Sequence, residues 1–155
     1  PEIDPAGLER IRGYVGQGGS YPTWMHAARA LKDSGGTAFP QFEISDWLAH
    51  ARRLMCVSGN GRIVFDYDMK IAEPILAADP EASFDMWPAF RALAGRPVLA
   101  LRGELSDLFA PATLARMQAE LPDCEGVVVP GVGHAPTLAE PEAQAAIARL
   151  LERVA

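Results

Sequence analysis

Two short segments of the sequence carry side chains that could do acid–base chemistry. Residues 102–107 read Arg-Gly-Glu-Leu-Ser-Asp and end on Asp107, and residues 130–136 read Pro-Gly-Val-Gly-His-Ala-Pro and contain His134. A carboxylate that accepts a hydrogen bond from the Nδ1–H of an imidazole fixes its tautomer and stabilises the imidazolium, which makes the histidine a better general base. Asp107 and His134 are therefore the candidate catalytic residues, and Glu104 is the alternative acid.

Each segment follows a short apolar run that is typical of a strand buried on both faces. These runs, residues 97–101 (PVLAL) and 126–129 (GVVV), are bounded by turn residues. A strand–helix–strand–helix order at this spacing predicts an α/β fold in which two adjacent parallel strands are joined by a right-handed crossover. The carboxyl ends of the two strands would then bring Asp107 and His134 to the same edge of the sheet.

Helical patterns flank the two strands. Pro111 opens a helix between them that has Leu114, Met117 and Leu121 on one side. Residues 141–154 have apolar residues at i, i+3, i+4 and i+7 spacing. Within that second helix, Ile147, Leu150 and Leu151 are expected to pack against the sheet. Two strands cannot make a stable sheet by themselves, and parallel sheets need cover on both faces. We therefore expect residues outside this sequence to complete the sheet.

The strand–loop segments resemble the last two units of the α/β-hydrolase superfamily. The resemblance rests on residues 97–107 (PVLALRGELSD) and 127–140 (VVVPGVGHAPTLAE). In that family the triad acid follows the penultimate strand and the histidine follows the last one, which implies Asp107 as the acid and His134 as the histidine. The resemblance also implies that residues 1–94 are a helical cap region that begins with a strand exit. Residues 95–155 would be the C-terminal core unit.

The nucleophile that the family requires is missing from the sequence. It stands in a G-x-S-x-G turn between a strand and a helix, upstream of the cap, and no such pentapeptide occurs here. The candidate serines Ser20, Ser34 and Ser58 do not match this pattern and do not follow a predicted strand. We interpret the chain as the C-terminal half of the fold. It is expected to be inactive without the N-terminal half that carries the nucleophile.

Short helices are predicted throughout the cap region. The expected helices cover residues 5–15, 23–33, 45–55, 69–77 and 83–93, with a short extended run at residues 63–65. Because a cap of this kind closes over the site, Trp47 and Tyr67 are the candidate substrate-binding residues. Packing inside the cap is the alternative role for both side chains.

Composition and charge exclude several classes of protein. The chain has 155 residues, of which 49% are hydrophobic and 22% charged, so it is not disordered. A net charge of −6 argues against nucleic acid or a membrane surface as the main partner. With no leader-like or membrane-spanning segment and only two cysteines, a cytoplasmic location is expected. Twelve Arg against two Lys hint at a GC-rich bacterial genome. No cofactor or metal is implied.

The resemblance implies a hydrolase that acts on a small, mainly apolar ester, lactone or related substrate. A nucleophile on the N-terminal half would attack the carbonyl, His134 would act as general base, and Asp107 would orient His134. An Asp nucleophile would instead give dehalogenase or epoxide hydrolase chemistry. A non-catalytic protein of the same fold that binds a ligand or a partner chain is the alternative from another class. A proteolytic fragment without a function of its own is a third interpretation.

Overall fold

The computed structural model describes residues 2–77 and 85–154. Within this range, residues 2–9 and 85–154 form one compact unit, and residues 10–77 form another. The expected boundary after residue 94 lies inside the first of these units, because Trp87 and Phe90 of α5 (Trp87–Arg91) are buried in the core beneath the C-terminal strands.

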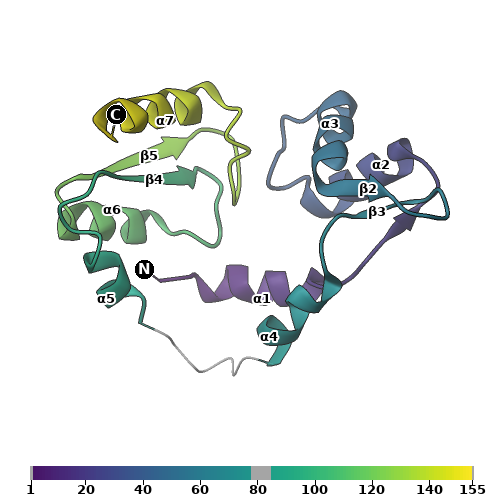
Figure 1. Ribbon diagram of the computed structural model, residues 1–155, viewed down its shortest axis with the longest axis horizontal. Coiled ribbons are helices and arrows are strands. Elements are labelled where there is room, and N and C mark those ends of the chain that lie inside the picture. Colours follow the sequence, from purple (N-terminus) through teal and green to yellow (C-terminus); the bar gives the residue numbers. More distant parts are fainter. Residues whose placement is uncertain (1, 78–84, 155) are drawn as a thin grey trace. The chain divides into compact units, whose positions relative to one another are not determined.

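Two parallel strands form the sheet of the C-terminal unit (Figure 1). β4 (Val98–Gly103) pairs with β5 (Cys124–Val129) along its full length. α6 (Pro111–Glu120) connects the two strands, and α7 (Pro141–Val154) follows β5. The predicted α/β arrangement of two adjacent parallel strands with a connecting and a following helix is confirmed.

The two helices cover opposite faces of this sheet. Side chains alternate between the faces of a strand, and consecutive residues of β5 meet different helices. Glu125 forms an ion pair with Arg149 of α7 at 2.5 Å. A Cβ built on Gly126, by contrast, would lie 2.6 Å from the side chain of Gln118 of α6, so glycine allows this close approach. Figure 1 shows the same arrangement, with α7 on one side of the strands and α6 on the other.

Apolar side chains fill the space between the sheet and the helices α5 and α6. The buried cluster consists of Trp87, Phe90, Ala100, Leu114, Leu121 and Cys124. Leu114 lies on the α6 face that the apolar spacing predicts, and Met117 packs against the same cluster. The rings of Trp87 and Phe90 meet edge to face, with centroids 5.8 Å apart, which is a favourable geometry for two aromatic quadrupoles.

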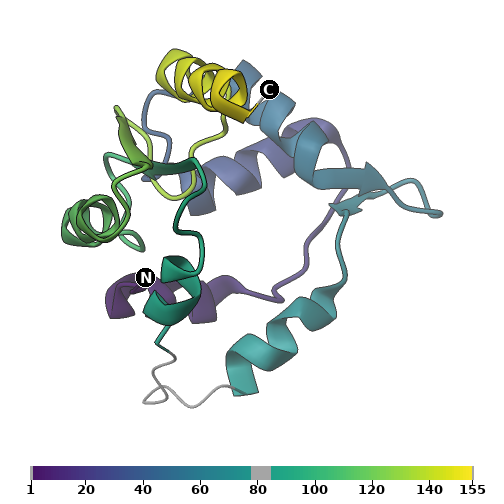
Figure 2. The ribbon, with the colours of Figure 1, turned by 60° about the vertical axis from the view of Figure 1, so that its left-hand side comes forward.

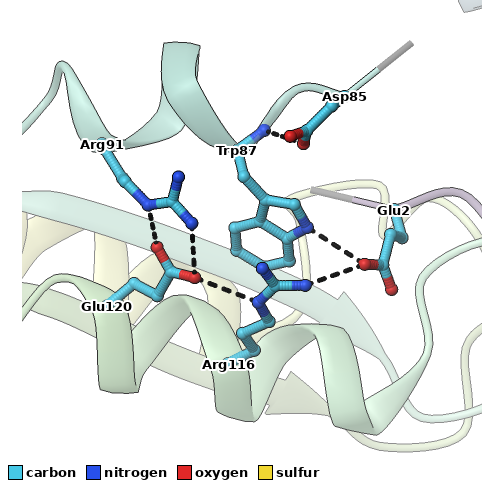
Figure 3. Close-up of polar contacts among 6 residues, drawn as sticks. All are labelled: Glu2, Asp85, Trp87, Arg91, Arg116 and Glu120. Atoms are coloured by element: carbon cyan, nitrogen blue, oxygen red, sulfur yellow. Dashed lines mark hydrogen bonds and ion pairs between the residues drawn. The ribbon is translucent and has the colours of Figure 1, made fainter.

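The N-terminal segment is tied to α5 and α6 by a polar network (Figure 3). The Glu2 carboxylate accepts hydrogen bonds from the Trp87 indole N–H at 3.1 Å and from the Arg116 guanidinium at 2.9 Å. The same guanidinium stacks on the Trp87 ring, 3.8 Å from its centroid. Glu120 forms ion pairs with both Arg116 and Arg91. These contacts hold the start of the chain on the α5–α6 side of the unit.

The apolar stripe of α7 is only partly covered. Ala143 and Ala146 are fully buried, and Ile147 and Leu150 are partly buried. The side chain of Leu151 is 58% exposed, so the prediction that it packs against the sheet is wrong for this chain. The stripe spans more of the helix circumference than two strands can cover, since consecutive residues are rotated by about 100° around a helix.

A helix pair and a small antiparallel sheet make up the second unit. α2 (Trp24–Gly35) packs on α3 (Ile44–Leu54). The sheet contains β1 (Ser20–Tyr21), β2 (Met55–Val57) and β3 (Ile63–Phe65) in the order β1-β3-β2.

Beyond the sheet, the chain continues through a 3₁₀ turn, η1 (Met69–Ile71), into α4 (Ala72–Ala77). α1 (Pro5–Tyr14), which ends in this unit, confirms the helix expected at residues 5–15. Figure 2 shows these elements from a second direction.

The extended run expected at residues 63–65 is confirmed as β3, and the antiparallel sheet adds two strands, β1 and β2, that the sequence did not predict. The helix expected across residues 45–55 ends at Leu54, and Met55 begins a strand. The turn between β2 and β3 contains Gly61, whose φ of +78° is unfavourable for residues with a side chain. Strands of two or three residues leave almost no alternating pattern, so long-range pairing rather than local sequence decides their conformation.

Some sequence-based expectations lie at the edges of the described range. The helix expected at residues 83–93 is represented by α5, while residues 83 and 84 lie outside the described residues. None of the helices in residues 2–77 and 85–154 has both the length and the apolar character of a membrane-spanning segment.

Candidate active site

The loops that carry Asp107 and His134 leave the sheet at neighbouring points. Gly103, the last residue of β4, is paired with Val129, the last residue of β5. Beyond that pair the ladder continues into the loops, where the N–H of Glu104 donates to the carbonyl of Val129 at 2.8 Å. The N–H of Leu105 donates to the carbonyl of Val132 at 2.9 Å. The structure therefore brings the two predicted loops together at one edge of the sheet.

Gly103 is required by this close approach. A Cβ built on it would overlap the carbonyl oxygen of Gly133 and would lie 2.5 Å from that of Val132. Any side chain here would force the histidine loop away from the acid loop. Val129 at the end of β5 and Val132 within the histidine loop are 0% and 1% exposed, so the loop is closely packed at both positions.

Glu104, the alternative acid, takes part in the connection between the two loops. Its carboxylate accepts a hydrogen bond from the N–H of Gly131 at 2.8 Å, directly after β5. Gly131 has a φ of +67°, so the chain turns sharply at this point. Glu104 therefore binds the backbone of the histidine loop, and its role as the alternative acid stays a prediction.

The acid loop is folded around a buried arginine. Arg102 of β4 is 6% exposed, and its guanidinium donates to the carbonyl of Phe109 at 2.6 Å. It also donates to the carbonyls of Glu104 at 3.1 Å and Ser106 at 3.2 Å. Sequence reasoning did not single out Arg102. A charged residue at the end of a predicted buried strand was the signal that could have found it.

The side chain of Ser106 connects the acid loop to the histidine side chain. Its Oγ lies 3.4 Å from Nδ1 of His134 and accepts a hydrogen bond from the N–H of Phe109 at 3.1 Å. Ser106 is buried, whereas the next residue, Asp107, and His134 are exposed. The predicted hydrogen bond between the Asp107 carboxylate and Nδ1 of His134 stays a prediction. Ser106 is a further residue that the sequence did not indicate, because a serine beside an acidic residue is common in loops.

The segment after His134 is held by a second carboxylate. Glu140 accepts hydrogen bonds from the backbone N–H and the hydroxyl of Thr137, both at 2.9 Å. Burial acts to raise the pKa of Glu140, but these bonds, together with the N–H groups of Glu140 and Leu138, outweigh it and hold the pKa below its usual value. The histidine loop is therefore braced between β5 and α7.

The two candidate substrate-binding residues lie in different surroundings. Trp47 is 2% exposed and belongs to an aromatic cluster with Phe39, Phe42 and His50, with ring centroids 5.2–6.1 Å from its own. Tyr67 is 45% exposed, and its ring lies 5.3 Å from that of Phe65. Trp47 is thus part of the core of its unit, and Tyr67 lies at the surface. A substrate contact stays a prediction for both.

Metal-ligating side chains and thiols are the other reactive groups of the chain. Among the residues described, no cluster of three or more His, Cys, Asp or Glu side chains could hold a metal ion. Burial raises the pKa of the Cys124 thiol. Burial and the carboxylate of Asp66 raise that of Cys56, so the nucleophilic thiolate is disfavoured at both positions.

A solved structure decides the family. The crystal structure of an α/β hydrolase from Novosphingobium aromaticivorans superposes on this chain with a TM-score of 0.89 and 57% sequence identity. The match covers 99% of this chain and 54% of the hydrolase. The chain belongs to the α/β-hydrolase fold superfamily. Both the predicted resemblance and the predicted fold class are confirmed.

Other comparisons agree with this α/β-hydrolase assignment. The chain is 34% identical to the 3-hydroxybutyrate-oligomer hydrolase of Cupriavidus necator, over 96% of this chain and 52% of that protein. The structure of a protein from Rickettsia typhi matches 97% of the chain with a TM-score of 0.77 at 20% identity, which supports the fold alone. No protein-family model matches the chain. The chain spans about half the length of the relatives it matches.

Proposed function

We propose that this chain forms the acid- and histidine-bearing half of a hydrolase that transfers the acyl group of a small, mainly apolar ester or lactone to water. The observation that carries the proposal is the joining of the two loops after β4 and β5, with Nδ1 of His134 3.4 Å from the residue that precedes Asp107. A histidine held beside an acidic loop at the carboxyl edge of a parallel sheet suits general-base catalysis.

The proposed reaction has two steps. In the first, His134 removes the proton of a nucleophile on the remaining half of the fold. The nucleophile attacks the carbonyl carbon, and the proton passes to the leaving alcohol. In the second step, His134 removes a proton from water, whose oxygen attacks the acyl carbon. The bond between the acyl group and the nucleophile breaks, the acid leaves, and His134 returns the proton to the nucleophile. Asp107 accepts the Nδ1–H of His134 and stabilises the imidazolium formed in both steps.

The proposed substrate class agrees with the chemistry of a relative. The Cupriavidus necator relative is named a 3-hydroxybutyrate-oligomer hydrolase. Units of a hydroxy acid are joined into an oligomer by ester bonds. The proposal for this chain is restricted to the shared chemistry, a small ester or lactone carbonyl. The remaining half of the fold is its proposed partner, because the chain spans about half of its relatives.

The test uses a polypeptide that contains the whole fold. This is either the full-length protein or a fusion of this chain to the unmatched part of the Novosphingobium aromaticivorans hydrolase. We expect turnover of p-nitrophenyl acetate, of 3-hydroxybutyrate dimer or of a small lactone. His134→Ala should lower kcat by about 10⁴-fold or more, because it removes the general base. Asp107→Asn should lower kcat by about 10²–10⁴-fold, because it favours the wrong tautomer of His134.

Two matched controls address general effects of these substitutions. His26→Ala removes a histidine that interacts with the Thr23 hydroxyl, and Asp123→Asn removes a carboxylate in a surface ion pair with Arg153. Both should leave kcat within about threefold of the parent. Full turnover in His134→Ala would refute the proposal. Turnover of haloalkanes or epoxides instead of esters would retain the site but change the reaction class, and binding without turnover would indicate a non-catalytic protein.

A further inference from the structure

Arg102 is a charged side chain enclosed by the loop that carries the candidate acid. It stands on the α6 side of β4, since side chains alternate along the strand and Ala100 belongs to the core on that side. Its three described hydrogen bonds reach carbonyl oxygens of residues 104, 106 and 109, so the acceptors surround Asp107 in the sequence.

The chemistry of this contact requires a guanidinium. Three carbonyls approach it through three different nitrogens, Nε, Nη1 and Nη2, and only arginine offers several donors in one rigid plane. A lysine ammonium could serve some of these acceptors, but it is a point charge on a flexible stem. An apolar residue would leave the carbonyls without these donors in a buried position. The conformation of the loop therefore depends on the side chain at position 102.

Arg102 binds the main chain both before and after Asp107. The carbonyl of Ser106, directly before Asp107, and that of Phe109, two residues after it, are both bound by the guanidinium. The start of the chain also contacts this loop, since the N–H of Asp4 donates to the carbonyl of Leu108 at 3.0 Å. A Cβ on Gly7 would lie 2.5 Å from the carbonyl oxygen of Asp107, so α1 also lies against the loop.

We propose that Arg102 is a positioning residue, which holds the acid loop in the conformation that presents Asp107 to His134. This inference rests on the proposed hydrolase function and adds to it a residue that does not touch the substrate. Arg102 acts through Asp107, so its contribution to turnover should disappear when Asp107 can no longer serve as the acid.

The test is a double-mutant cycle in the polypeptide that contains the whole fold. Arg102→Met should lower kcat by about 30- to 100-fold, with KM changed by less than about threefold, because a shift of about 1 Å in a catalytic group has an effect of this size. Arg102→Lys should restore part of the loss. In the Asp107→Asn background, Arg102→Met should lower kcat by less than about threefold.

A second arginine of the same unit, Arg149, serves as the control. Arg149→Met removes an arginine from a surface ion pair of the same unit and should leave kcat unchanged. Assays are made well below the melting temperature of each variant. If Arg102→Met does not fold, the same comparison of kcat with and without Asp107→Asn is made with Arg102→Lys. If Arg102→Met lowers kcat by the same factor in the parent and in the Asp107→Asn background, Arg102 has only a structural role. The inference is then overturned, while the proposed function stands. If Asp107→Asn itself keeps full turnover, the proposed acid is wrong, which is a separate failure.

Discussion

At the scale of single residues, the candidate site depends on residues other than Asp107 and His134. Gly103 has no side chain, yet it determines how closely the acid loop and the histidine loop can approach each other. Arg102 and Glu104 then bind backbone groups of the two loops, which brings Ser106 within 3.4 Å of His134. The loops that carry the candidate residues Asp107 and His134 are thus held mainly by hydrogen bonds to the main chain.

Gly103→Ala should separate the two loops. The new Cβ would overlap the carbonyls of Gly133 and Val132, and overpacking of this kind costs about 1–3 kcal/mol in free energy of unfolding. In the polypeptide with the whole fold, we expect a tenfold or larger loss of kcat at temperatures where the variant is folded. Gly59→Ala is the matched control, because a Cβ there would meet nothing within 4 Å. A Gly103→Ala variant with unchanged denaturation midpoint and unchanged kcat would contradict the described approach of the loops.

At the scale of elements, the helix pair of the second unit combines aromatic packing with a titratable group. His50 of α3 lies 5.7 Å from the ring of Phe39 and 5.9 Å from that of Trp47. Burial, and then the positive charge of Arg53, lower the pKa of His50 from its ordinary value of 6.5. Protonation of His50 therefore opposes the packing of this helix pair.

This lowered pKa predicts a pH-dependent stability. Below pH 6.5 the unfolded chain takes up a proton more readily than the folded chain, so stability falls as the pH drops from about 7 towards 5. His50→Gln should remove this part of the loss. Between pH 8 and pH 5, the free energy of unfolding should fall more for the parent than for His50→Gln. Urea denaturation of both proteins at the two pH values measures this difference. Parallel pH profiles for the two proteins would show that His50 keeps its ordinary pKa.

At the scale of the whole molecule, apolar side chains of both β5 and α7 are exposed in the described part of the chain. Leu151 and Val154 of α7 are each 58% exposed, and Val128 of β5 is 46% exposed. Parallel sheets are normally covered on both faces and continued by further strands. These surfaces fit a chain that spans about half the length of its α/β-hydrolase relatives.

Hydrogen exchange should show whether a further strand joins β4. The N–H of Val98 donates to the carbonyl of Asp123, and that of Glu104 to the carbonyl of Val129, so alternation directs the amides of Leu99 and Leu101 away from β5. In this chain alone, these two amides should exchange rapidly. In the polypeptide with the whole fold, they should be protected by at least about 100-fold.

The amides on the opposite edge of the same strand are the internal control. Those of Ala100 and Arg102 face β5 and should be protected in both proteins. Equal exchange of Leu99 and Leu101 in the two proteins would mean that no strand is added at this edge. Rapid exchange of Ala100 and Arg102 in the short chain would show that the sheet does not persist without the rest of the fold.

The sequence by itself determined the features that local patterns encode. Continuous apolar runs predicted β4 and β5, helical spacing predicted α6 and α7, and the loops with Asp107 and His134 followed from the ends of those runs. Only the tertiary structure decided which side chains hold these loops together, because the contacts of Arg102 and Ser106 depend on how the chain folds back. Likewise, long-range pairing rather than helical spacing ended α3 at Leu54 and placed Met55 in a strand. The exposure of Leu151 shows the same limit: periodicity predicts an apolar face, but burial depends on what lies opposite.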